Sequence, residues 1–76
     1  MNRSANNAYR LYVTSVKDRM RNVYQTSFPL TQPGLHDAQD AFNKLQEEVA
    51  VVELKLFRHD ENGLKLLQRF EREEKS

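Results

Sequence analysis

The sequence predicts an all-α fold, namely an antiparallel helical hairpin with a long second helix. Three observations predict it. Apolar residues recur every three or four positions in two long segments, as they do on one face of an α-helix. Only two glycines and two prolines occur among the 76 residues. The most strand-like segment, residues 49–56, lies inside a longer helical period, so the length of the pattern favours a helix.

The first helix is expected over about residues 4–26. Its apolar positions are separated by four, three, four and three residues, the spacing of a narrow coiled-coil stripe. They are Tyr9, Val13, Val16, Met20 and Val23. Ser4 is a suitable N-cap, because its hydroxyl can accept from amides of the first turn. The linker 27–34 contains both prolines, and Thr31 is expected to cap the next helix with Pro33 in its first turn.

The long second helix is expected over about residues 35–74, which completes a single helical domain over residues 1–76. Its apolar positions alternate at three and four residues without interruption: Leu35, Ala38, Phe42, Leu45, Val49, Val52 and Leu56. The same register continues to Gly63, Leu66 and Phe70. Asn62–Gly63 is a common turn signal, so a break near Gly63 that creates a short third helix stays open as an alternative. The preserved register favours the continuous helix.

A second set of apolar residues lies off this stripe and predicts a binding surface for a partner. The set is Val51, Leu54, Phe57, Leu64 and Leu67. A two-helix hairpin buries too little apolar surface to offset the entropy of ordering the chain, so another polypeptide is expected to complete the core. The predicted function is that of a non-enzymatic scaffold or interaction subunit in a larger helical or coiled-coil assembly. The pattern does not distinguish a homo-oligomer from a hetero-oligomer.

Charged residues are distributed unevenly along the chain, and the basic ones allow several interpretations. Residues 1–31 carry five Lys or Arg against one acid, whereas residues 32–76 carry seven against ten. The predicted basic surface of the first helix is Arg3, Arg10, Lys17 and Arg21. These cations flank a helix–helix contact, bind phosphates of a nucleic acid, or belong to a membrane-surface or mitochondrial targeting helix. The alternative functions are a nucleic-acid-binding module that uses this basic helix, and, independently of the charges, a small regulator or inhibitor that docks one helix into a groove of its target.

Several classes of chemistry find no support in the sequence. The chain has no cysteine, which excludes disulfides and cysteine–zinc sites. His36 and His59 lie in no zinc pattern, and a calcium loop aligned on Gly63 would place Arg58 and Arg69 at its first and last ligand positions. We therefore expect no catalytic residues, no metal and no cofactor.

The sequence also predicts the setting of the protein. Its longest uninterrupted apolar run, Val49–Val52, is far too short for a membrane-spanning helix, and no secretory signal is recognisable. We therefore expect no transmembrane segment and an intracellular location, cytoplasmic or nuclear, with a mitochondrial one as the alternative.

Overall fold

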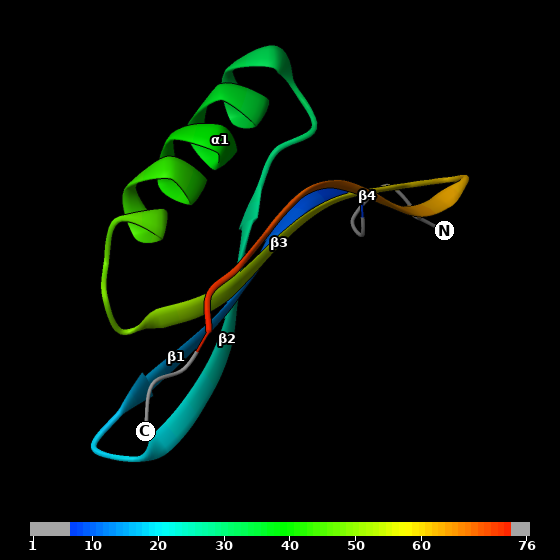
Figure 1. Ribbon diagram of the computed structural model, residues 1–76. Coiled ribbons are helices and arrows are strands. Elements are labelled where there is room, and N and C mark those ends of the chain that lie inside the picture. Colours follow the sequence, from blue (N-terminus) through cyan, green and yellow to red (C-terminus); the bar gives the residue numbers. More distant parts are fainter. Residues whose placement is uncertain (1–6, 74–76) are drawn as a thin grey trace.

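The protein folds as a four-stranded antiparallel sheet with one helix on one of its faces (Figure 1). The computed structural model describes residues 7–73. The elements are β1 (Ala8–Lys17), β2 (Met20–Phe28), α1 (Gln32–Gln46), β3 (Val51–Asp60) and β4 (Gly63–Glu71). The strand order is β2-β1-β3-β4, so the first strand of each hairpin lies at the centre and the second lies at an edge.

The expected all-α hairpin and coiled coil are wrong, because the segment expected to form the first helix is a β-hairpin. β1 pairs with β2 from Tyr9 opposite Phe28 to Lys17 opposite Met20. The spacing of Tyr9, Val13 and Val16 fits a helix, but Tyr9, Leu11 and Val13 also alternate, and these three are buried. The hairpin is rich in Val, Thr, Tyr and Phe, whose side chains suit a pleated sheet. The expected cap Ser4 lies outside the described residues.

The expected long helix over 35–74 is also wrong, since α1 ends at Gln46 and a second hairpin follows. The phase that continues through Gly63 is therefore accidental, and neither the continuous helix nor the short third helix forms. Asn62 instead lies in the turn between β3 and β4, and Gly63 is the first residue of β4. The Asp60 carboxylate accepts a hydrogen bond from the Asn62 backbone N–H at 2.9 Å, and Gly63 has φ +104°, which favours glycine.

The start of α1 confirms the predicted cap. Thr31 is extended, and its hydroxyl oxygen accepts a hydrogen bond from the Gly34 N–H at 3.0 Å. Pro33 lies in the first turn, where its missing N–H has no intrahelical acceptor to lose. The predicted helical positions Ala38 and Phe42 are buried, and they face the sheet.

The core lies between α1 and the two central strands. Its members alternate along β1 and β3 and recur at helical spacing on α1: Tyr9, Leu11, Val13, Ala38, Phe42, Val51, Leu54 and Leu56. Leu11 lies opposite Leu56, and Val13 lies opposite Leu54. One helix therefore covers one face of the sheet, and no described element covers the other (Figure 1).

Arg72, which directly follows β4, connects this strand to the end of α1 and to the loop between α1 and β3. Its guanidinium donates to the carbonyls of Gln46 and Glu48, each at 2.7 Å, and to that of Val51 at 2.8 Å. It also lies over the Phe70 ring, 5.0 Å from the centroid. These carbonyls include the unpaired acceptors that follow a helix, where a cation is favoured. Arg72 therefore adds to the backbone cap of α1, in which the Glu47 N–H donates to the Lys44 and Leu45 carbonyls.

We expect Arg72→Ala to lower the free energy of unfolding by about 2 kcal/mol, because several carbonyls lose a charged donor together. Arg72→Lys should recover only part of this loss, since an ammonium cannot reach the same spread of acceptors. Urea denaturation of the three proteins measures the effect. Equal midpoints for Arg72→Ala and the wild type would show that the clamp contributes nothing to stability.

Candidate functional site

The candidate site is the face of the sheet that points away from α1. Strand register assigns to it the alternate residues that do not enter the core. We call this surface the open face; its members are Arg10, Tyr12, Thr14, Arg21, Val23, Gln25, Glu53, Lys55, Phe57, His59, Leu64, Leu66, Arg69 and Glu71. Every strand contributes to it.

The centre of the open face is apolar. Tyr12 and Phe57 lie on the two central strands and meet edge to face, with ring centroids 5.6 Å apart. They help to line an open hollow of about 520 Å³ together with Val23 and Leu64, and the rest of its lining is polar: Thr14, Arg21, Glu53 and Lys55. Three aliphatic side chains of this face are largely in solvent: Val23 is 64% exposed, Leu64 56% and Leu66 46%. Such grouping in a small domain marks a binding surface more often than scattered single residues do.

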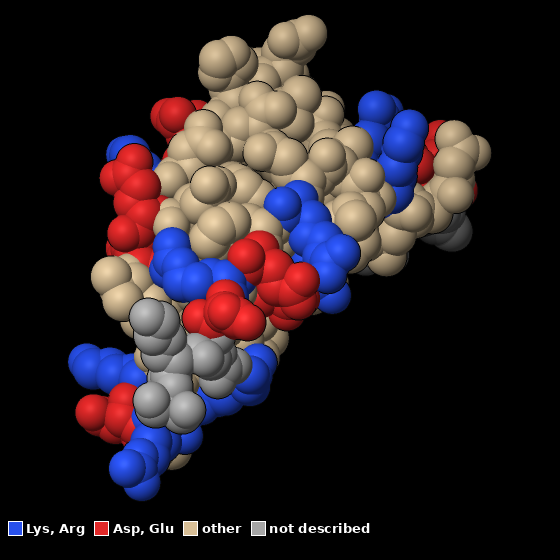
Figure 2. Space-filling view, in the orientation of Figure 1, with Lys and Arg blue, Asp and Glu red and all other residues tan. Residues whose placement is uncertain are grey.

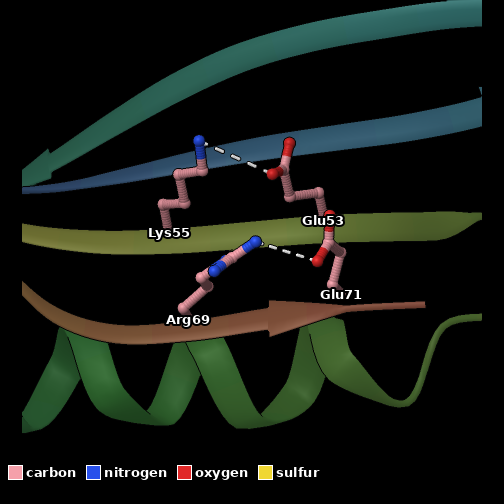
Figure 3. A network of polar contacts seen from close by, with 4 residues as sticks. All are labelled: Glu53, Lys55, Arg69 and Glu71. Carbon is pink, nitrogen blue, oxygen red and sulfur yellow. Dashed lines mark hydrogen bonds and ion pairs between the residues drawn. The ribbon is translucent and has the colours of Figure 1, made fainter.

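On the open face, four charged residues of β3 and β4 form ion pairs along their own strands (Figure 3). Lys55 Nζ lies 3.5 Å from Glu53 Oε2, and Arg69 Nη2 lies 2.9 Å from Glu71 Oε1. Across the strands, Glu53 lies opposite Glu71 and Lys55 lies opposite Arg69. Like charges directly opposite each other repel, so each side chain finds its counter-ion two residues away on the same strand. Both cations thus already have a partner within the chain.

A second polar group lies at the other end of the open face. Arg10 Nε donates to His59 Nδ1 at 3.2 Å, and its Nη1 donates to the Ser27 hydroxyl at 3.3 Å. These contacts link β2, β1 and β3. They leave the apolar centre bordered by polar groups at both strand ends, which is the arrangement of a protein interface with a polar rim.

Charge separates the two layers of the molecule. Residues 8–28, which form the first hairpin, carry four Lys or Arg against one acid. Residues 32–50, which form α1 and the loop after it, carry one lysine against four acids. In Figure 2, red side chains lie along the side occupied by α1 and its following loop, and blue ones predominate at the tip of the β1–β2 hairpin. The layer of the helix is therefore acidic, and the first hairpin is basic.

The residues predicted to bind a partner are divided by the sheet. Val51 and Leu54 lie in the core of the chain itself, where Leu54 is 0% exposed. Phe57 and Leu64 lie on the open face, and Leu67 is exposed in β4 where the register with β3 shifts. Helical spacing grouped these five residues, whereas strand pairing separates them.

The predicted basic surface is also separated. Arg10 lies near the start of β1, Lys17 is its last residue, and Arg21 lies near the start of β2. They do not form one stripe, and Arg3 lies outside the described residues. Tyr12, Val23 and Leu66 belong to the open face, but sequence reasoning did not select them as a binding surface. Alternation of their positions with core residues was the signal that could have found them.

Neither a metal-binding cluster nor a membrane-spanning helix is formed by residues 7–73. Within this part of the chain, no three His, Asp or Glu side chains gather to hold a metal ion. Its single helix is neither long nor apolar enough to cross a membrane. No protein-family model, curated protein or solved structure matches the chain.

Proposed function

We propose that this chain is a non-enzymatic interaction module that binds another protein through the open face of its sheet. The observation that carries the proposal is the uncovered apolar centre, in which Tyr12 and Phe57 adjoin the exposed side chains of Val23, Leu64 and Leu66. A protein surface with apolar side chains would remove these groups from water. A helical or coiled-coil assembly has no part in this proposal.

The composition of the open face favours a protein over a nucleic acid. Lys55 and Arg69 are paired with carboxylates of their own strands, and Arg10 donates to His59 and Ser27. Binding to phosphates would have to compete with these contacts. Tyr12 and Phe57 meet edge to face and do not form two parallel platforms for bases, and the exposed side chains around them are aliphatic. Nucleic-acid binding is therefore the alternative outcome of the test.

Docking of a helix into a target groove receives less support. The apolar residues of α1, Ala38 and Phe42, are used against the sheet of the chain itself. The outer side of the helix carries Asp37, Asp40 and Lys44, which are exposed. It offers no apolar stripe to a groove.

The proposal is tested by a double variant of the open face, Leu64→Lys with Leu66→Lys. Both side chains are exposed, so the fold should keep its stability to within about 1 kcal/mol. Val49→Lys is the matched control, since Val49 is 87% exposed but lies in the loop after α1. Tagged forms of the three proteins are expressed in the source cells, and the co-purifying proteins are quantified.

We expect at least one protein to co-purify stoichiometrically with the wild type and the control and to be depleted at least tenfold with the double variant. Equal recovery with all three forms would contradict binding through this face. Salt-sensitive retention of nucleic acid, lost on Arg10→Gln and Arg21→Gln, would instead support the alternative function.

A further inference from the structure

We propose that the outer edge of β2 pairs with the same edge of a second copy of this chain, antiparallel and centred on Tyr24. β2 lies at one end of the strand order, so no described strand pairs with its outer side. The inference goes beyond the proposed function, because it concerns the backbone edge of β2, although Arg21, Val23 and Gln25 of that strand also contribute side chains to the open face. It joins two four-stranded sheets into one continuous sheet.

The two edges of the sheet differ in how they are protected. β4 pairs with β3 through a register shift, and it carries three charged side chains, Lys65, Arg69 and Glu71. Bulges and charges of this kind prevent edge strands from pairing with other chains. β2 pairs with β1 over nine residues without a shift, contains no proline and carries only one charge, Arg21. Only β2 is therefore a regular and unprotected edge.

The hydrogen-bond pattern shows which groups of β2 face outward. The Val16 N–H donates to the Ala50 carbonyl at 2.8 Å, so the backbone of Val16 is directed toward the β3 side. Arg21, its neighbour on β2, therefore directs its own N–H and C=O away from β1. Because the direction alternates along a strand, Arg21, Val23, Gln25 and Ser27 present these groups at the outer edge.

The β2 strand of a second copy can pair antiparallel with this edge without bringing like charges together. Pairing centred on Tyr24 uses the whole strand, with Arg21 opposite Ser27 and Val23 opposite Gln25. The two Arg21 side chains are then about 20 Å apart, so like charges do not meet. Met20, Val23 and Tyr24 are exposed apolar residues of β2, and each gains a cross-strand neighbour.

The geometry also fixes the form of the dimer. Pairing at this register has its two-fold axis perpendicular to the sheet, so the two open faces lie on one side and both helices lie on the other. Only one strand per copy is in contact, and we therefore expect a weak dimer that dissociates at micromolar concentrations. The interface does not include Leu64 or Leu66, so failure of this proposal and failure of the proposed function are distinguishable.

Because the chain has no cysteine, single thiols can be introduced to test the register. At the centre of the pairing, the two copies of residue 24 form a non-hydrogen-bonded pair with Cα atoms about 4.5 Å apart, which suits a disulfide. Tyr24→Cys should therefore give a covalent dimer under mild oxidation. Thr26→Cys is the matched control, since its two copies would lie about 13 Å apart. Equal cross-linking of both variants would overturn the proposed pairing.

Sedimentation equilibrium of variants that contain no cysteine is the second test of the dimer. We expect the wild type and Val23→Thr to shift from monomer to dimer with rising concentration. Val23→Pro removes one outward N–H without removing a β1–β2 hydrogen bond, and it should weaken the dimer at least tenfold. Circular dichroism verifies that this variant is folded. A wild type that stays monomeric at millimolar concentration would overturn the proposal. If Val23→Pro does not fold, the comparison of cross-linking in Tyr24→Cys and Thr26→Cys tests the pairing instead.

Discussion

Leu54→Ala is expected to lower the free energy of unfolding by about 3–4 kcal/mol. Leu54 is fully buried between α1 and the sheet, where it lies opposite Val13 and Phe70 on the neighbouring strands. Truncation removes its burial and leaves a cavity that a two-layer core cannot readily collapse. For a domain of this size, the loss is a large part of the total stability. Denaturant unfolding followed by circular dichroism measures it.

Phe57→Ala is the informative comparison, because a helical hairpin would place both residues on the same outer surface. In the sheet, Phe57 is half-buried on the open face and packs against Tyr12. Its replacement should cost less than about 2 kcal/mol, since solvent can fill the space that it leaves. If Phe57→Ala were as destabilising as Leu54→Ala, the assignment of the two residues to opposite faces would be contradicted.

Gly34→Ala is expected to destabilise the protein by about 3 kcal/mol or more. A Cβ atom on Gly34 would lie 1.9 Å from the Pro29 carbonyl oxygen and 2.9 Å from its carbonyl carbon. Both atoms are backbone, so the connection between β2 and α1 must move to admit a methyl group. The movement would also disturb the hydrogen bond from the Gly34 N–H to Thr31. Thermal unfolding of the variant measures the combined cost.

Gly63→Ala separates this steric effect from the general cost of replacing a glycine. No atom lies within 4 Å of a Cβ at Gly63, but its φ of +104° is unfavourable for alanine. We expect a loss of about 1–2 kcal/mol from backbone strain alone. A Gly34→Ala effect no larger than that of Gly63→Ala would show that the close approach to Pro29 is not a constraint.

The sequence predicted the start of α1 correctly because the signals there are local. Thr31 and Pro33 determine the first turn through hydrogen bonding and a fixed φ, and Ala38 and Phe42 continue the apolar stripe. The end of the helix has no comparable signal. The Lys44 and Leu45 carbonyls accept from the N–H groups of Glu47 and Glu48, but the carbonyl of Gln46 accepts from Arg72, which lies more than twenty residues further along the chain. The helix therefore appeared to continue.

The strands were missed because two periods coexist in the same residues. In β1, Tyr9 and Val13 fit a helical stripe, but the intervening Leu11 fits only an alternating strand, and it is fully buried. In β3, Leu54 and Leu56 alternate with Glu53 and Lys55. The length of the apolar pattern favours a helix, but the pattern extends across a helix, a loop and two strands.

The turn between β1 and β2 could not be predicted, because its sequence is not one that usually forms such a turn. Asp18 and Arg19 connect β1 to β2 with φ values of +54° and +67°, a conformation for which Asn–Gly is the usual sequence. The contacts between strands fix both residues in a conformation that their own preferences do not indicate. The open face was equally hidden, since Tyr12, Phe57 and Leu66 become neighbours only through the pairing of three strands.

The most direct measurement of the central claim is the amount of the co-purifying protein recovered with Leu64→Lys and Leu66→Lys relative to Val49→Lys. All three positions are exposed, so Val49→Lys shows the effect of a surface lysine away from the open face, and the single variants Leu64→Lys and Leu66→Lys match it in the number of charges added. If a partner covers the side of the sheet that α1 leaves bare, the control should retain it and the double variant should lose at least nine-tenths of it. Retention of the partner by both would contradict the claim.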